Sequence, residues 1–343
     1  MGKRRLIPYR VASGVATRLQ AYRVTGGIAR KLQPYDVYIE SNPSADPVVT
    51  VYTTGGDSGA VTRIETGLGV TPALMSSYVQ QDANFGTIKR DIYRNWMDKG
   101  VTPYITIASK DGNTYSHAQI ANSNSAALAR VDEIVAFMSD LQDYAEPLGI
   151  TLKVGWESEF EVKVNHGSMT GVSNQQYADS CGIFYNKISA ARSGSSPIET
   201  IYHVGHFDNV AISDILSKMT VPFDIMGLDP YRNPGRDPDE TYFDSLDGKD
   251  TNPMSLRQNA DFIRLGTPDI AITETGTDRS YGDASMAAWY SQVDEYITAR
   301  DLRFVIIFSS DSGPINNANF INVGLTQTEN EVRQLLLRAG SAV

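Results

Sequence analysis

Two short segments of the sequence, Leu152-Lys-Val-Gly-Trp-Glu157 and Ile270-Ala-Ile-Thr-Glu274-Thr-Gly, are each a largely apolar run that leads into a glutamate. Short apolar runs of this kind are typical of strands buried in a sheet. An ionised carboxylate is costly to bury, so a glutamate at the end of a buried strand indicates a functional position. The two glutamates can act together only if both strands belong to one sheet and point the same way.

Six further segments have the composition of buried strands, and helical segments separate them along the chain. The eight predicted strands are 48–53, 70–78, 103–108, 152–156, 200–205, 223–228, 270–273 and 304–308. The predicted helices are 60–67, 85–99, 126–145, 175–192, 210–219, 255–265, 285–299 and 329–338. Parallel strands require crossover helices, and eight such units in about 300 residues favour a (β/α)8 TIM barrel. An open doubly wound sheet is the alternative.

Individual residues of the predicted helices carry further expectations. Ile88, Ile92 and Trp96 form an apolar stripe that is expected to face the core. Cys181 is the only cysteine of the chain and is predicted to be a small core residue. A single cysteine excludes an intrachain disulfide and a cysteine metal site, and no set of histidines has zinc spacing. The sequence therefore predicts neither a metal nor a cofactor.

The charge of the chain is unevenly distributed. The net charge is −10, yet residues 1–46 hold eight Lys and Arg against three Asp and Glu, so the remainder carries −15. The basic start lacks the apolar core of a signal peptide, and no apolar run approaches the roughly 18 residues of a membrane helix. The acidic body argues against nucleic acid as a substrate. We predict an extension over 1–46 that anchors on an acidic partner, followed by a barrel over 47–343.

In a TIM barrel, the residues that follow the strands form the rim that carries the chemistry. The rim predicted here is acidic and aromatic, which suits stacking on sugar rings and hydrogen bonding to their hydroxyls. Its members are Tyr52, Tyr78, Glu157, His203, His206, Asp208, Asp229, Tyr231, Glu274, Ser309, Ser310 and Asp311. His203 and His206 are each expected either to orient a carboxylate or a sugar, or to have a structural role.

Two carboxylates at one mouth of a barrel are suited to cleaving a glycosidic bond. In a retaining glycosidase one carboxyl is a protonated acid and the other an ionised nucleophile, about 5–5.5 Å apart. The fourth and seventh strands lie across the mouth from each other, so Glu157 and Glu274 are expected to meet over one bond. Trp156 would supply an apolar wall that raises the pKa of Glu157 towards the acid role.

These motifs resemble those of clan A glycoside hydrolases, and within the clan the chain is most similar to family 26, which comprises mannanases and related endo-glycanases. The resemblance covers about residues 47–340 and is sharp at Gly155-Trp156-Glu157, Ile272-Thr273-Glu274-Thr-Gly and Leu228-Asp229-Pro-Tyr231. It implies that Glu157 is the acid/base, Glu274 the nucleophile and Tyr231 a hydrogen-bond donor to Glu274. The family has an asparagine two residues after the acid, where this chain has Glu159, so substrate contacts are expected to differ.

The roles of the two glutamates have alternatives. Glu159 and Glu161 alternate with Glu157, so a one-residue register error would move the acid role to Glu159. Alternatively, Glu157 and Glu274 are rim carboxylates in structural ion pairs. The residues predicted to bind substrate or to position the catalytic pair are Tyr231, Trp156, His206, Asp229, Glu159 and Tyr78.

A second resemblance concerns the setting of the barrel. The segments Val51-Tyr-Thr-Thr-Gly and Gly69-Val-Thr-Pro-Ala-Leu resemble barrel domains carried by tail proteins of phages that infect actinobacteria. This implies a homo-oligomeric virion protein that acts outside the cell and contacts other tail proteins through residues 1–46. The sequence thus predicts a retaining endo-glycosidase acting on a cell-envelope polysaccharide. The alternative is a catalytically silent barrel that serves as a structural or receptor-binding tail protein.

Overall fold

The computed structural model describes residues 22–25, 28–31, 48–53, 59–109, 115–165, 167, 169–191, 197–205, 209–232, 239–247, 253–309 and 318–339. The chain divides into two compact units, Met1–Ala45 and Asp46–Val343. In the first unit, β1 (Tyr22–Thr25) pairs antiparallel with β2 (Ile28–Lys31). The anchoring role of residues 1–46 stays a prediction, and His206 lies outside the described residues.

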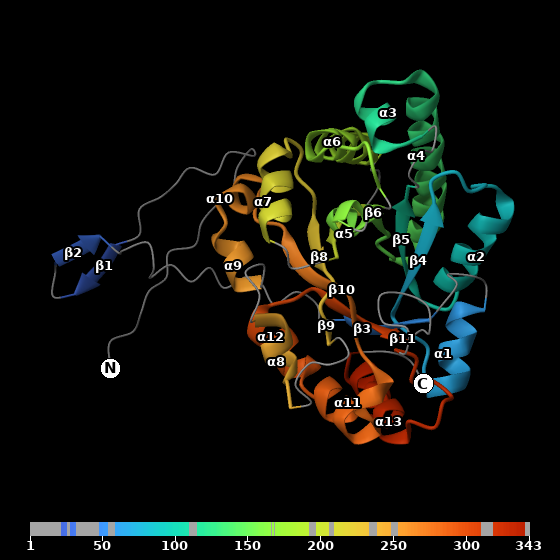
Figure 1. Ribbon diagram of the computed structural model, residues 1–343, viewed down its shortest axis with the longest axis vertical. Coiled ribbons are helices and arrows are strands. Elements are labelled where there is room, and N and C mark those ends of the chain that lie inside the picture. The colour runs from blue at the N-terminus through green and yellow to red at the C-terminus, as the bar shows by residue number, and fades with distance from the viewer. Residues whose placement is uncertain are drawn as a thin grey trace. The chain divides into compact units, whose positions relative to one another are not determined.

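Eight parallel strands form the second unit, and the predicted TIM barrel is confirmed (Figure 1). The strands are β3 (Val48–Thr53), β4 (Leu74–Gln80), β5 (Thr102–Ala108), β6 (Lys153–Ser158), β7 (Glu199–Val204), β8 (Ile225–Leu228), β10 (Asp269–Thr277) and β11 (Phe304–Ser309). Their order is β3-β11-β10-β8-β7-β6-β5-β4, and the short β9 (Tyr231–Arg232) pairs with β10. The Thr50 hydroxyl on β3 donates to the Leu74 carbonyl on β4, which joins the two ends of this order.

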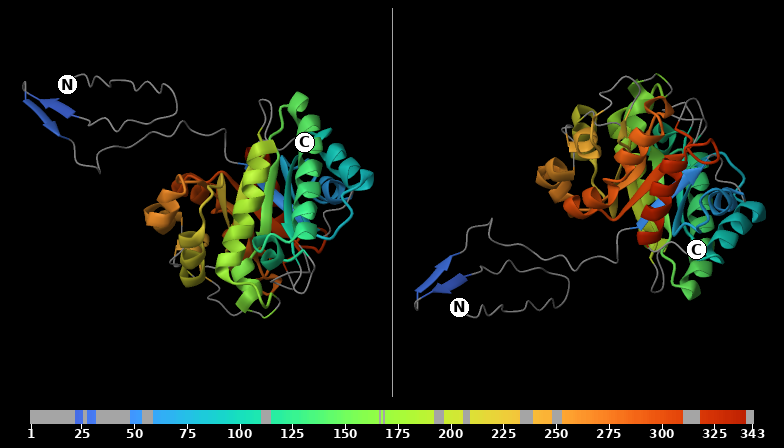
Figure 2. Two further views of the ribbon diagram at one scale, coloured as in Figure 1. Left: turned by 90° about the horizontal axis from the view of Figure 1, so that it is seen from above. Right: turned by 90° about the horizontal axis from the view of Figure 1, so that it is seen from below.

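Helices surround the strands (Figures 1 and 2). They are α1 (Ala60–Leu68), α2 (Thr87–Met97), α3 (His117–Ala121), α4 (Ser125–Ala145), α5 (Phe160–Asn165), α6 (Asn174–Ala191), α7 (Asn209–Lys218), α8 (Tyr242–Asp247), α9 (Pro253–Gln258), α10 (Ala260–Arg264), α11 (Asp283–Tyr290), α12 (Val293–Arg300) and α13 (Thr326–Arg338), with 3-10 turns η2 (Glu146–Leu148) and η3 (Arg279–Tyr281). Neighbouring helices pack in the series α2, α4, α6, α7 and α10, while α13 packs against both α11 and α1. Within the described part of the chain, no helix combines the length and apolar character needed to cross a membrane.

Two clusters of side chains fill the barrel unit, one inside the strands and one between strands and helices. The inner cluster consists of Leu74, Tyr104, Ile201, Ile225, Ala271, Phe304, Ile306, Phe308 and Ala318. The larger outer cluster includes Trp96, Trp156 and Cys181, which is buried as predicted. Successive residues of a strand point alternately to the two clusters. A break in this alternation near a strand end therefore moves a side chain between the mouth and the helix layer.

Several predicted elements differ from the structure. β4 begins at Leu74 rather than at residue 70, and the segments 255–265 and 285–299 each contain two helices. In the first of these, the Asn259 side chain accepts hydrogen bonds from two backbone N–H groups and so starts the new helix α10. Ile88 is 81% exposed. The other two residues of the predicted stripe face the core, with Trp96 buried and Ile92 partly buried. Tyr93 and Met97 complete the buried face of α2.

Candidate active site

Glu274 lies in the C-terminal part of β10, where the pairing with β11 has a register irregularity. Its two carboxylate oxygens accept hydrogen bonds from two hydroxyls, one from Tyr78 on β4 and one from Tyr231 on β9. The Glu274 side chain is 6% exposed. The hydrogen bond expected from Tyr231 to Glu274 is therefore present, and Tyr78 supplies a second donor of the same kind.

A second buried carboxylate, Asp229, lies just after β8. It accepts a hydrogen bond of 2.7 Å from the Thr273 hydroxyl and pairs with Nε2 of His203 on β7. Nδ1 of His203 is 3.1 Å from the Tyr104 hydroxyl. Burial lowers the pKa of His203, so a neutral ring donates from Nε2 to Asp229 and accepts at Nδ1. His203 thus orients a carboxylate, which is one of the roles expected for it. The Asp229 carboxylate is held in place by His203 and Thr273.

Burial and negative neighbours govern the charge of Glu274. Burial, followed by the nearby carboxylates of Asp229 and Glu159, raises the pKa of Glu274 to about 8, against the opposing effect of the Tyr231 hydrogen bond. Burial and Glu159 likewise raise the pKa of Asp229 well above its usual range. Carboxylates that share one mouth resist being charged together, so the group retains a proton at a pH where an isolated glutamate is an anion.

Glu159 contributes its carboxylate to the same mouth. The side chain is half-buried, and its negative charge acts on Glu274, Asp229 and His203. Its backbone N–H donates to the carbonyl of His203 at 3.3 Å. The negative charge of Glu159 therefore raises the pKa of Glu274 directly.

Glu157 lies in a different environment, and its side chain has no exposed surface. It accepts hydrogen bonds of 2.7 Å from the backbone N–H and the hydroxyl of Ser109, of 3.1 Å from Nε2 of His117 and from the N–H of Ser158, and it forms an ion pair with Lys163. Burial raises the pKa of Glu157, but Lys163 and His117 outweigh this effect and lower it to about 2. A carboxyl group with this pKa is an anion at neutral pH and does not suit the expected role of proton donor. The structure places Glu157 in an ion pair with Lys163, and its catalytic role stays a prediction.

Trp156 also differs from its expected role as a pocket wall. Its ring stacks on Phe184 of α6 with the centroids 4.2 Å apart, and its Nε1–H donates to the Ser180 hydroxyl at 2.7 Å. The Ser180 oxygen is 2.6 Å from Nδ1 of His117. Every group in this series of hydrogen bonds has a partner when the Ser180 hydroxyl donates to Nδ1 of His117 and Nε2 of His117 donates to Glu157. Trp156 therefore supports the Glu157 site from the helix layer and does not raise the pKa of Glu157.

Three of the buried groups have the chemistry of metal ligands. In the described part of the chain, one ligand atom each from His203, Asp229 and Glu274 lie within 4.8 Å of one another. The same atoms already take part in hydrogen bonds, since His203 pairs with Asp229 and both oxygens of Glu274 accept from tyrosines. A cation would compete with the hydrogen bond between His203 and Asp229 and with the two tyrosine donors, so we treat the trio as a hydrogen-bonded group.

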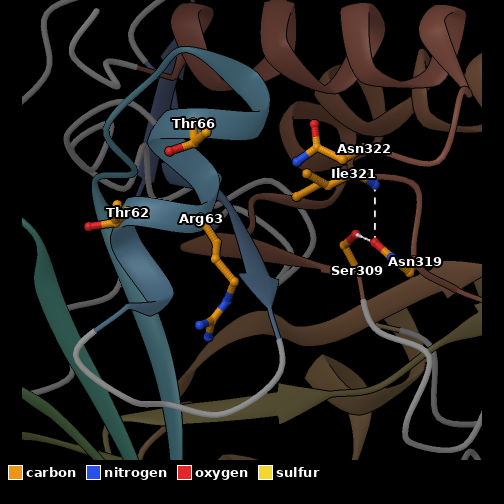
Figure 3. A pocket seen from close by; sticks show the side chains of 7 residues that line it. All are labelled: Thr62, Arg63, Thr66, Ser309, Asn319, Ile321 and Asn322. Atoms are coloured by element: carbon orange, nitrogen blue, oxygen red, sulfur yellow. Dashed lines mark hydrogen bonds between the residues drawn. The ribbon is translucent and has the colours of Figure 1, made fainter.

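A hollow of about 290 Å³ lies on the same rim, between α1 and the segment after β11 (Figure 3). Its lining residues are Thr62, Arg63, Thr66, Ser309, Asn319, Ile321 and Asn322. The Ser309 hydroxyl and the Ile321 N–H both donate to Oδ1 of Asn319 at 3.1 Å, which fixes this wall. Six of the seven lining residues are of polar types, and Ile321 is the apolar one.

Comparisons with known proteins identify the architecture. No protein-family model and no curated protein matches the chain. A GH26 β-mannanase from Bacteroides ovatus superimposes with a TM-score of 0.57 and 13% identity over 84% of this chain and 88% of that one. The catalytic domain of a GH26 endo-β-1,4-mannanase from Bacillus sp. JAMB-750 has a TM-score of 0.56 and 16% identity over 85% of this chain and 86% of that one. A GH26 domain from Prevotella bryantii has a TM-score of 0.55 and 12% identity over 86% of this chain and 89% of that one. The barrel has the GH26 mannanase fold.

Sequence reasoning missed four residues of this GH26-like barrel that shape the site. Ser109 and His117 follow β5 and hold Glu157, Lys163 pairs with it, and Gly205 adjoins Glu159. Ser109 follows a predicted strand and was open to detection as a rim residue. The others had no signal, because Lys163 is six residues from Glu157 and the role of Gly205 depends on a side chain from another strand.

We expect Lys163→Met to lower the free energy of unfolding by about 3 kcal/mol at pH 7, because it leaves the buried Glu157 anion without its cation. A lowered carboxyl pKa stabilises the fold above the usual pKa of about 4.3, and this contribution is lost as the pH falls towards 2. The difference in the free energy of unfolding between variant and wild type should therefore become smaller as the pH falls through this range. Urea denaturation at several pH values measures it.

Lys187→Met is the matched control, since Lys187 pairs with Asp132 on the surface, where the two side chains are 34% and 60% exposed. Its effect should stay below about 1 kcal/mol at every pH. Equal losses of unfolding free energy in Lys163→Met and Lys187→Met would show that the buried Glu157 anion does not depend on Lys163.

Asp229→Asn should lower the pKa of Glu274, because it removes a negative charge while preserving a partner for His203. Carboxyl 13C NMR titration measures the shift, and the resonance is assigned by its loss in Glu274→Gln. A Glu274 pKa that is unchanged in Asp229→Asn would show that the two carboxylates are not coupled.

Proposed function

We propose that the barrel is a retaining endo-glycosidase in which Glu274 is the nucleophile and Glu159 the acid/base. One observation carries the proposal: the two hydroxyls of Tyr78 and Tyr231 hold the Glu274 carboxylate at the strand ends, beside the half-buried Glu159. The GH26 fold supports it, since in a TIM barrel catalytic groups lie at this face. Glu159 takes the acid role that the sequence assigned first to Glu157.

The reaction proceeds by double displacement. Glu159 donates its proton to the glycosidic oxygen while a carboxylate oxygen of Glu274 bonds to the anomeric carbon, and the bond from that carbon to the leaving oxygen breaks. Glu159, now an anion, takes a proton from water, whose oxygen bonds to the anomeric carbon and releases Glu274. Tyr78 and Tyr231 orient Glu274, and the hydrogen bond from Tyr231 favours the anion that attacks, against the effects of burial and of the neighbouring carboxylates on its pKa.

The charge of the mouth indicates the class of substrate. Glu159, Asp229 and Glu274 place three carboxyl groups at one site, which disfavours polyanionic glycans and favours neutral ones. We assign the polar hollow lined by Thr66, Asn319 and neighbouring residues to a further sugar unit of the chain, which is consistent with endo action. Mannans and neutral cell-envelope polysaccharides are the first substrates to screen.

The virion setting is part of the proposal and rests on the sequence resemblance to phage tail barrels, with residues 1–46 as the contact to other tail proteins and a homo-oligomeric assembly. The separate basic unit Met1–Ala45 supports it. The competing function is a silent barrel that binds glycans without cleaving them. The departure of Glu157 from its expected role favours neither function, because Glu159 stands in its place.

Wild-type protein should release reducing ends from its polysaccharide, and Glu274→Ala and Glu159→Gln should each lose about 10²–10⁴-fold in rate, because each removes a group that the transition state needs. Glu157→Gln should retain more activity than Glu159→Gln. Glycan binding by all variants without release by wild type would establish the silent barrel instead.

The assignment of the two roles has its own test, which uses an aryl glycoside with a good leaving group and added azide. In Glu159→Ala, azide should attack the glycosyl-enzyme and give a glycosyl azide of retained configuration. In Glu274→Ala it should attack the substrate directly and give the inverted azide. NMR of the products distinguishes the two, and the reverse pattern would exchange the roles.

A further inference from the structure

The buried Glu157 carboxylate connects three segments at the mouth of the barrel. Its hydrogen-bond partners come from the end of β5 (Ser109), from α3 (His117) and from α5 (Lys163). Lys163 also donates its backbone N–H to the carbonyl of Glu159 at 3.0 Å. The ion pair between Glu157 and Lys163 therefore closes a short loop, and Glu159 lies inside that loop.

The backbone of this loop is strained. Glu157 has φ of 68° and Glu159 has φ of 53°, so two non-glycine residues in a three-residue stretch adopt the left-handed conformation. The left-handed conformation is unfavourable for a residue other than glycine and persists only where surrounding contacts impose it. The pairing of β6 with β7 shifts register between Gly155 and Ser158, in the same stretch. The contacts of Glu157 hold this conformation together with the hydrogen bonds that join Glu159 to His203 and Glu161 to Gly205.

Gly205, which follows β7, provides the space that Glu159 occupies. A β-carbon at position 205 would clash with the Cβ, Cγ and Oε1 of Glu159, and its three nearest neighbours would all belong to that side chain. The N–H of Gly205 donates to Oε1 of Glu161 at 2.6 Å, which ties the loop to β7. A side chain at position 205 would therefore act first on Glu159.

We infer that Glu157 and Gly205 are positioning residues that aim the Glu159 carboxylate at the bond above Glu274, with Glu157 acting through the loop and Gly205 through the space it leaves. The inference rests on the proposed function and deepens it, because it assigns to the first glutamate after β6 the task of placing the second. Glu157 touches no reacting atom in this arrangement. Its anionic charge matters because only an anion holds Lys163 and the backbone donors together.

The experiment compares Glu157→Gln, Gly205→Ala and wild type on two substrates, the polysaccharide and an aryl glycoside of the same sugar with a good leaving group. Cleavage of the polysaccharide needs protonation of the leaving oxygen, whereas cleavage of the aryl glycoside does not. Both variants should lose about 10²-fold in kcat on the polysaccharide with KM little changed, and should keep near wild-type cleavage of the aryl glycoside when glycosylation limits the rate. Equal losses on both substrates would overturn the inference.

The matched control is Glu199→Gln, which disrupts the ion pair with Lys153 at the opposite end of β6 and β7, where the side chains are 19% and 12% exposed. It should lower Tm without changing the ratio of the two activities. A ratio that changes as much in this control as in Glu157→Gln would assign the effect to stability and overturn the inference.

Crystal structures of the two variants give a readout that does not depend on activity. We expect the Glu159 carboxylate to be displaced from Glu274 in both, with φ at Glu159 no longer left-handed in Glu157→Gln. An unmoved Glu159 in both structures would overturn the inference. Wild-type protein that cleaves neither substrate would refute the proposed function, whereas the crystallographic result would still decide whether these residues position Glu159.

Discussion

The site depends on the point at which β6 breaks its side-chain alternation. Gly155 faces Tyr104 and Thr106 inside the barrel and Trp156 faces α6, so strict alternation would turn Glu157 into the mouth. The register irregularity between Gly155 and Ser158 instead leaves Glu157 among donors from α3 and α5. Breaks of this kind next to functional sites re-aim side chains. The proposed acid role of Glu159 in place of Glu157 depends on that shift.

Glu157 on β6 and Glu274 on β10 have opposite pKa shifts because the groups around them differ. Both are buried, which raises a carboxyl pKa in each case. Glu157 has a lysine and a set of N–H and O–H donors, which favour the anion. Glu274 has two tyrosine donors but also the carboxylates of Asp229 and Glu159, which favour the protonated form. Burial alone therefore does not sort catalytic from structural carboxylates, whereas the sign of the surrounding charge does.

The sequence was sufficient for the parts of the structure that depend on composition and order. Eight apolar runs separated by helical patterns predicted the barrel, and the place of Glu274 at a strand end predicted its exposure to the mouth and its bond from Tyr231. The sequence was insufficient where a shift of one residue decides whether a side chain faces the mouth or the helices. Trp156 and Glu157 were both assigned to the pocket, and both belong to the helix side. Trp156 faces the helices by regular alternation, whereas Glu157 does so through a break in alternation, which has no compositional signature.

Asp229 has a consequence for the charge balance of the proposed mechanism. The hydrogen bond from Thr273 favours the anion of Asp229, whereas burial and Glu159 raise the pKa of Asp229 well above its usual range. Negative charge on Asp229 in turn raises the pKa of Glu274. The proposed mechanism requires one proton on the pair, carried by Glu159 before the first displacement. When Glu274 becomes an ester, Glu159 has just lost that proton, so the number of negative charges in the mouth stays constant. Both displacement steps then avoid the repulsion that would arise if all three carboxylates were charged together.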